Sequence, residues 1–355
     1  MAVLALVIFA AAVNLDSAEE EGGSQLGVQV HTFQDSRGVT VASPSFDLTR
    51  DFTDRTALRA RFGVDGISAA SDSCVRCHKQ GVTSARAVLG ASLVRKLTNA
   101  KLSVGAELSQ ENFYRSTTIL SSASRTFNKA NTTVAGGFSF SLNQPKLHPR
   151  DAGRTQLTEN AFVSVTQTLT KTTVVQAGYE VGHIGGYQND PFLRARVNGE
   201  LVLGNNPDSR TRHTLTLRVR QALPAASYVE GDYRYYRDDW ELRSSSLSLG
   251  VSHQFSPQVL VKLGYRGYRQ TGTSFYAPEY FESPEFFTSD FRLMPFASRL
   301  FSGRTVLTPS DGLWFFAKGT SLMFEYERYS SDADFQAVIF SAGVRVPLGA
   351  HGGSR

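Results

Sequence analysis

Residues 213–220 read HTLTLRVR, and this stretch decides the fold class because its side chains alternate between apolar and polar. Leu215, Leu217 and Val219 would lie on one face of an extended strand, with threonines and arginines on the other. Alternation with a period of two is typical of a β-strand that has one apolar and one polar face, whereas an amphipathic helix requires a period near 3.6. The stretch therefore predicts β-structure.

The same alternation recurs along the chain from Leu26 onward, for example in residues 101–109, 134–142, 258–266 and 338–346. Short runs rich in turn residues separate many of these segments, which is typical of antiparallel strands joined by tight turns. The sequence thus predicts an all-β fold.

Counting the alternating segments gives about 16 strands in one domain over residues 25–350. Two strands contain a proline, Pro44 and Pro295, and proline lacks the backbone donor that a central strand needs, so 14 strands is the alternative. The expected strands are 26–34, 39–50, 55–66, 85–96, 100–111, 115–127, 132–142, 158–169, 173–184, 212–222, 226–237, 242–254, 258–268, 288–301, 313–328 and 335–348.

Alternation alone fits both a soluble sandwich, whose apolar faces point inward, and a transmembrane antiparallel β-barrel, whose apolar faces contact lipid. The segments are long enough for tilted membrane-spanning strands. Their polar faces carry charges of both signs, as a hydrated channel wall would. These charged residues include Arg59, Arg61, Asp65, Glu107, Glu180, Glu230, Asp232 and Arg234.

The lengths of the connections also favour the barrel. The long connections 66–84, 143–157, 185–211 and 269–288 all fall on one side of a barrel whose chain starts at the other. Since periplasmic turns of such barrels are short and extracellular loops are long, we expect a barrel in the bacterial outer membrane, surrounded by outer-membrane lipid. A soluble exported β-protein is the alternative.

Composition adds to this picture. The 355 residues are 41% hydrophobic and 19% charged, and no run past residue 13 is long and apolar enough for a spanning helix. Residues 1–18 begin with an apolar run and predict a signal peptide. The formal charge of +5 is scattered without a basic block, so we expect no nucleic-acid partner. No nucleophile elbow, P-loop or dinucleotide fingerprint is present, and we predict no enzymatic activity.

The only two cysteines form the one motif that carries chemistry. Cys74, Cys77 and His78 have the Cys-x-x-Cys-His spacing in which two thiols attach a haem covalently and the histidine binds its iron. The sequence therefore predicts haem c in the loop 66–84, with His78 as the iron ligand. His31 and His148 are the candidates for a distal ligand, and a five-coordinate iron is the alternative.

Other chemistry remains open for this motif. A local disulfide between Cys74 and Cys77 would be stable in an oxidising compartment. A zinc site is weaker, because three ligands cluster where structural zinc requires four. The main hypothesis is a barrel with a single haem, acting in electron transfer or redox sensing with a partner cytochrome or periplasmic redox protein. The alternative is a haem-free, porin-like channel or scaffold with Cys74–Cys77 as a loop disulfide.

Three parts of the chain carry a resemblance to a known family: residues 41–58 leading into 64–71, residues 289–296 (SDFRLMPF) and residues 340–348 (FSAGVRVPL). They are similar to a family of proteobacterial outer-membrane proteins, domain of unknown function 3570 (DUF3570). The resemblance implies an outer-membrane barrel over nearly all of the chain. It implies no established activity and no catalytic residues. The motif from Cys74 to His78 departs from this family and is similar to that of c-type cytochromes.

Overall fold

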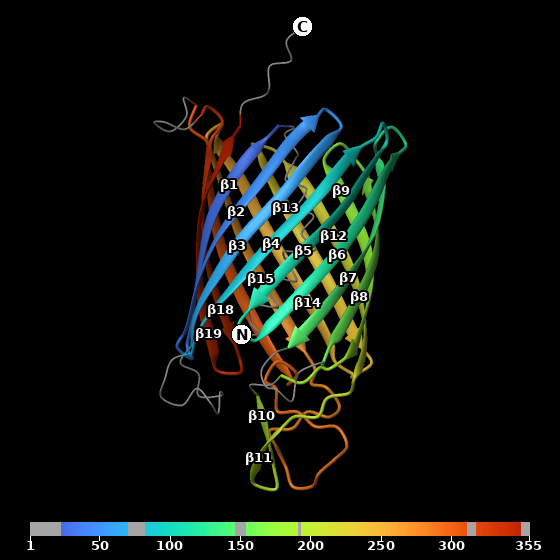
Figure 1. Ribbon diagram of the computed structural model, residues 1–355. Helices are drawn as coiled ribbons and strands as arrows, with labels where there is room; N and C mark the ends of the chain where they lie inside the picture. Colours follow the sequence, from blue (N-terminus) through green and yellow to red (C-terminus); the bar gives the residue numbers. More distant parts are fainter. Residues whose placement is uncertain (1–22, 70–81, 146–153, 191–192, 311–316, 349–355) are drawn as a thin grey trace.

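The computed structural model describes residues 23–69, 82–145, 154–190, 193–310 and 317–348. Sixteen strands form one closed antiparallel barrel, which confirms the predicted fold and strand number (Figure 1). The barrel strands are β1 (Gln25–Asp35), β2 (Val39–Thr53), β3 (Thr56–Ala69), β4 (Val82–Lys96), β5 (Ala100–Glu111), β6 (Tyr114–Phe127), β7 (Thr132–Pro145), β8 (Gln156–Thr168), β9 (Thr173–Gly186), β12 (Ser209–Leu223), β13 (Ser227–Asp238), β14 (Arg243–Ser256), β15 (Val259–Gln270), β17 (Phe296–Leu307), β18 (Ser321–Ser331) and β19 (Phe335–Pro347).

Each barrel strand pairs with its neighbour in sequence, and β1 closes the ring on β19 from Gln25↔Pro347 to Asp35↔Ala337. Among the described residues, no helix is long and apolar enough to cross a membrane. The predicted signal peptide, residues 1–18, lies outside the described part of the chain.

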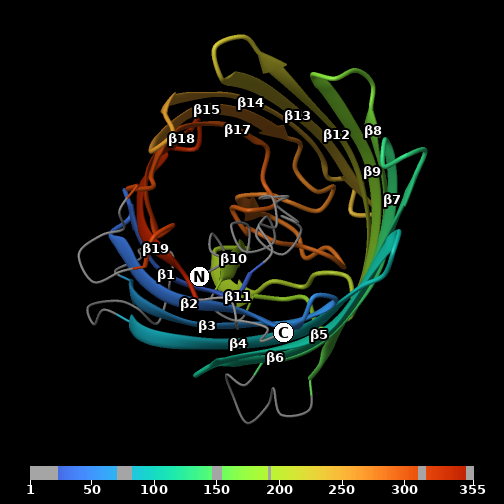
Figure 2. The same cartoon turned by 90° about the horizontal axis from the view of Figure 1, so that it is seen from above.

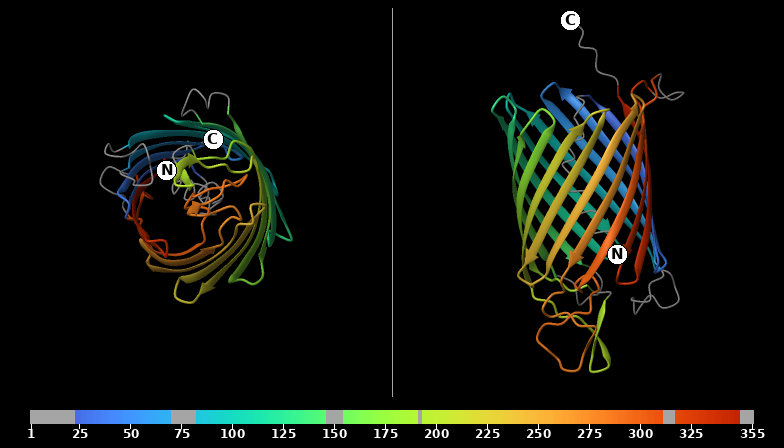
Figure 3. Two further views of the ribbon diagram at one scale, coloured as in Figure 1. Left: turned by 90° about the horizontal axis from the view of Figure 1, so that it is seen from below. Right: turned by 180° about the vertical axis from the view of Figure 1, so that it is seen from behind.

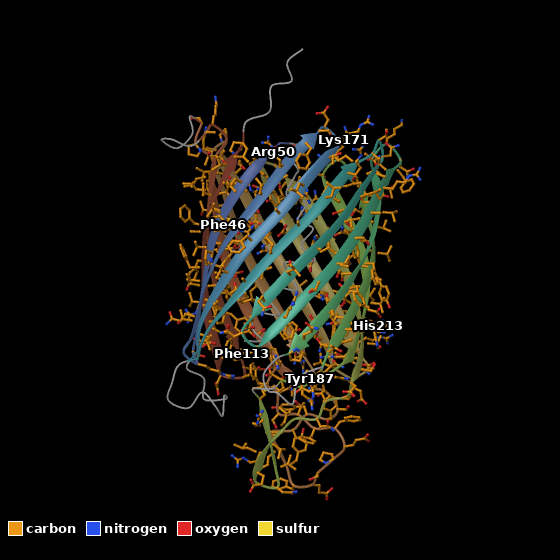
Figure 4. The ribbon with its side chains drawn as sticks, in the orientation of Figure 1. Phe46, Arg50, Phe113, Lys171, Tyr187 and His213 are labelled. Atoms are coloured by element: carbon orange, nitrogen blue, oxygen red, sulfur yellow. The ribbon has the colours of Figure 1, made fainter. Side chains whose placement is uncertain are left out.

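The apolar faces of the strands point outward. Leu215, Leu217 and Val219 are 55%, 47% and 37% exposed, whereas Thr214, directly before Leu215, is buried. Phe46 lies on the outer surface in the same way (Figure 4). Because exposed apolar side chains on every wall would be unfavourable in water, this outer face is a surface for lipid.

The long loops lie at one end of the barrel and most of the short turns at the other, as the sequence predicts. Arg50 and Lys171 mark the short-turn end, and Phe113 and Tyr187 mark the long-loop end (Figure 4). One connection departs from the rule, because residues 308–320 between β17 and β18 join strands at the short-turn end. We assign the long-loop end as extracellular.

Two predicted strands have wrong boundaries, and they are the two strands that the connection 308–320 joins. The strand predicted over 288–301 is β17, Phe296–Leu307, and the one predicted over 313–328 is β18, Ser321–Ser331. Pro295 ends the loop before β17, where the missing backbone donor carries no cost. Pro44, by contrast, does lie within β2, and pairing with β3 is interrupted between Ala42 and Ser45.

A second, small sheet was not predicted. It joins β10 (Arg194–Val197) and β11 (Glu200–Leu203), both from the connection between β9 and β12, to β16 (Glu279–Tyr280) from the connection between β15 and β17. These strands have two to four residues, too short for a period of two to be visible in the sequence.

The fold predicts that arginine is tolerated on the lumen side of a strand and not on the lipid side. Ile119→Arg in the middle of β6 should lower the free energy of unfolding by about 2–4 kcal/mol, because Ile119 faces lipid and is 58% exposed. Ser122→Arg, on the opposite face of the same strand, should change it by less than about 1 kcal/mol. Denaturant unfolding in lipid vesicles, followed by circular dichroism, measures both. Equal losses would contradict the assignment of the two faces.

Candidate functional site

The predicted haem residues Cys74, Cys77 and His78 lie in the segment 70–81, outside the described residues. The strands on either side fix where this segment leaves the barrel, because Ala69 at the end of β3 pairs with Val82 at the start of β4. Both positions are at the extracellular end, as predicted. Haem attachment itself remains a prediction.

Of the two candidate distal ligands, His148 also lies outside the described residues, in 146–153. His31 lies on the lumen face of β1, where its Nδ1 is 2.7 Å from Ser341 Oγ and its Nε2 is 3.3 Å from Gln29 Oε1. Both ring nitrogens therefore have hydrogen-bond partners, and binding to iron would require one of these bonds to break.

Charged side chains of both signs pair across neighbouring strands inside the barrel. Arg218 Nε on β12 donates to Asp232 Oδ2 on β13 at 3.1 Å. Arg220 Nε lies 3.7 Å from Glu230 Oε2, and Glu230 also accepts from Lys262 on β15. These five side chains come from β12, β13 and β15, and the bond between Glu230 and Lys262 crosses the intervening strand β14 on the inner wall.

The series extends to β17 and β18, where Arg304 Nη2 donates to Glu325 Oε2 at 3.0 Å. We call the seven residues the lumenal ion-pair ladder. Water reaches it, since the side chains of Arg218, Arg220 and Arg304 are 31%, 37% and 38% exposed although they point into the barrel. A barrel packed like a soluble core would bury such groups.

The inner face of β6, β7 and β8 is different, because along these three strands no charged side chain faces the lumen. Hydroxyl and amide groups bond to each other there instead. Thr118 Oγ1 and Ser141 Oγ are 2.8 Å apart, and Asn160 Nδ2 donates to Ser139 Oγ at 3.2 Å. We call this surface the hydroxyl strip. The lumen therefore has an uncharged side and a charged side.

The two longest described loops, residues 187–208 and 271–295, fold together over the extracellular end, and we call them the loop cap. Their strands β10 and β16 pair in parallel, through Arg196↔Glu279 and Val197↔Tyr280. Viewed along the barrel axis, the cap lies within the outline of the barrel (Figures 2 and 3). It therefore covers part of the mouth.

Arg292 holds the two loops of the cap together. Its Nη2 donates to Asp190 of the first loop at 2.7 Å, and its Nε donates to Asp290 of the second at 2.7 Å. Burial alone would lower the pKa of Arg292, but the charges and hydrogen bonds of Asp290 and Asp190 outweigh it and raise that pKa above its ordinary value. Arg292 thus stays protonated at any physiological pH.

An apolar cluster fixes the cap to the barrel rim. Trp240, Leu242 and Leu293 are buried together, with Phe275 against the Trp240 ring at a centroid distance of 5.2 Å. At the far side of the mouth, the cap contacts Arg37, which lies in the turn between β1 and β2. The Arg37 guanidinium lies over the ring of Phe291 in the cap, 4.9 Å from the ring centroid. The cap thus contacts the rim at two places.

Sequence reasoning did not find the cap. The aromatic and acidic stretch 275–287 was the available signal, since it contains Tyr280 and five more of the cap's aromatic residues. The Tyr280 hydroxyl accepts hydrogen bonds from the backbone amides of Ala277 and Thr288, at 2.8 and 2.9 Å, and so organises the loop. Met294, expected within a strand, belongs to the cap, where Tyr276 Oη lies 3.6 Å from its sulfur.

Comparison with solved structures finds similar barrels. A bacterial polysaccharide outer membrane secretin aligns with a TM-score of 0.54 at 10% identity, covering 92% of this chain and 98% of that one. A BenF-like porin from Pseudomonas fluorescens Pf-5 aligns with a TM-score of 0.50 at 8% identity, covering 93% and 99%. At these identities the likeness shows the fold alone. Together with the lipid-facing outer surface, this fold places the protein in the bacterial outer membrane.

Comparison with curated proteins finds no match. A family model described as protein of unknown function, DUF3570, matches residues 76–151 and 145–299. The matched region contains residues 289–296, one of the three parts on which the resemblance was based, whereas the parts near the two ends of the chain lie outside it. Because the match extends over more than half of the chain, the protein belongs to the DUF3570 family.

Proposed function

We propose that the protein is a porin-like channel, which conducts small hydrophilic solutes through a hydrated lumen. The observation that supports this most directly is the lumenal ion-pair ladder, whose arginines are inside the barrel and yet exposed to water. Paired charges of both signs keep the wall polar without a strong net field, while the hydroxyl strip offers hydrogen bonds to uncharged solutes.

The loop cap would restrict this channel at its extracellular mouth. It lies across the mouth from the Trp240 cluster to Arg37, and Arg292 keeps its two loops together. Solutes would pass beside the cap, so its stability would set the size of the opening.

Conductance in planar lipid bilayers tests the channel. Arg220→Gln/Lys262→Gln leaves Glu230 without its two cations, so the permeability ratio of cations to anions should rise by at least about two-fold at low salt. The matched control is Arg115→Gln/Arg125→Gln, which removes two arginines from the outer face of β6 and should leave the ratio unchanged. The absence of any conductance in the wild-type protein would contradict the proposal.

Loss of the Arg292 contacts should loosen the cap. Arg292→Gln removes the cation that bridges Asp190 and Asp290 and should weaken the docking of the two loops by about 1.5–3 kcal/mol. We expect faster hydrogen exchange of the β10 and β16 amides and a larger size limit for solutes. Arg196→Gln, an exposed cap arginine that bonds a backbone carbonyl, is the control. Exchange rates equal to wild type would show that Arg292 does not hold the cap.

We also propose, as a second function, that residues 66–84 carry a covalent haem c for electron transfer. The support is the spacing of Cys74, Cys77 and His78, at a loop whose flanking strands end at the extracellular mouth. One haem is too small to cross a bilayer core of about 30 Å. Electron transfer through the membrane would therefore need a partner cytochrome or a periplasmic redox protein.

A haem stain on a denaturing gel tests this second function, in cells that express the cytochrome maturation system. The wild-type band should stain, and Cys74→Ala/Cys77→Ala should not, since both thioether bonds are lost. His253→Ala, at the periplasmic rim next to Ser227, is the control and should stain like wild type. An unstained wild-type band would exclude covalent haem, and a shift of its mobility on reduction would indicate the Cys74–Cys77 disulfide instead.

A further inference from the structure

Five exposed arginines lie on the outer face of the barrel near its extracellular end. Each shares a strand face with exposed apolar residues that contact lipid, such as Tyr233 for Arg237 and Phe301 for Arg299. The five are Arg237 on β13, Arg243 on β14, Arg269 on β15, Arg299 on β17 and Arg328 on β18. We call them the arginine arc.

Strand register shows that the arc follows the rim. Arg237 and Arg243 are directly paired. Each further step moves two residues along the next strand, since Arg269 pairs with Ser245, Arg299 with Gly267, and Arg328 with Phe301. Because the strands tilt, as Figure 3 shows, such diagonal neighbours lie at similar heights around the barrel. Five like charges thus line one side of the rim.

This cluster of like charges is not repeated elsewhere on the described rim. Within the described residues, none of the five guanidinium groups is in an ion pair or side-chain hydrogen bond. On the corresponding outer face of β4–β9, the described charged residues near the extracellular end are Arg115 and Glu159, of opposite sign. Like charges repel, so an unpaired cluster of this kind indicates a binding partner with negative charge.

A crevice of about 400 Å³ lies at one end of the arc, lined by Thr211, His213, Tyr235, Arg237 and Arg243 together with three acidic residues. Two of these acids already have partners. The Asp238 side chain is fully buried and accepts from Arg210 at 2.5 Å, and Asp239 accepts from the Thr211 amide at 2.8 Å. Glu241 is the third. The carboxylates of Asp239 and Glu241 thus lie beside Arg237 and Arg243 here, and the arc continues away from them through Arg269, Arg299 and Arg328.

Below the arc, towards the middle of the membrane, the same strands expose an apolar surface. Tyr265 and Phe301 contact each other at a centroid distance of 5.1 Å, and Leu249, Leu263 and Tyr326 are 53%, 61% and 50% exposed. A ligand that fits both parts has negatively charged groups at headgroup level and hydrocarbon chains beneath them.

We propose that the arginine arc binds the phosphate groups of the phosphorylated glycolipid that forms the outer leaflet, with its acyl chains on the apolar surface below. Guanidinium groups donate paired hydrogen bonds to phosphate oxygens, and such charge-assisted bonds are strong at the edge of a bilayer. The proposal requires the outer-membrane location and the extracellular end assigned above. It does not require the channel or the haem.

The test uses the full-length barrel in detergent and purified lipid A, with native mass spectrometry to count bound lipid. The wild-type protein should bind lipid A at least about ten-fold more tightly than dephosphorylated lipid A. The variant with all five arginines changed to glutamine should lose that preference. Arg95→Gln/Arg125→Gln, which removes two outer-face arginines at the periplasmic end, should retain it.

Two further arms keep the result decisive. If the five-fold variant does not fold, as judged by its heat-modified gel mobility, Arg237→Gln/Arg243→Gln should still reduce binding several-fold. Phosphatidylglycerol, an anionic phospholipid, should bind more weakly than lipid A, because it carries one phosphate and fewer chains. Equal binding of lipid A to wild type and variant, or equal binding of lipid A and its dephosphorylated form, would overturn the proposal.

Discussion

The structure depends on one constraint, which is that no backbone hydrogen-bonding group can be left unpaired inside a membrane. Closure of β1 on β19, from Gln25↔Pro347 to Asp35↔Ala337, satisfies it by removing every free strand edge from the barrel. Once the ring is closed, each strand has one face toward lipid and one toward the lumen. The apolar side chains are therefore drawn outward, and the interior is left for polar groups.

This inversion explains the rest of the molecule. The barrel needs no apolar core, and the buried apolar cluster of the described residues is instead at the rim, around Trp240. The lumen can hold charges because they pair across strands and keep contact with water, as Arg218 does with Asp232. Outside, the same strands present hydrocarbon-facing side chains, with arginines only where lipid headgroups begin. Channel, cap and lipid surface are thus consequences of closure.

The barrel could be predicted from sequence because closure imposes a period of two, which residues 213–220 display, and because loop lengths reveal which end each turn occupies. The lumen position of His31 followed from the same parity. The cap could not be predicted, since its contacts, such as Arg292 with Asp190, join loops far apart in the chain. The strand predicted over 288–301 wrongly included Pro295, which lies just before β17. The haem motif is a local signal, readable only from Cys74, Cys77 and His78.

The measurement that tests the central claim most directly is the solvent accessibility of β12, residue by residue. Spin labels placed singly at residues 214–219 in lipid vesicles report collisions with apolar oxygen and with a water-soluble nickel complex. We predict strict alternation, with the nickel complex favoured at Thr214, Thr216 and Arg218 and oxygen favoured at Leu215, Leu217 and Val219. Uniform exclusion of the nickel complex from all six positions would contradict a hydrated lumen.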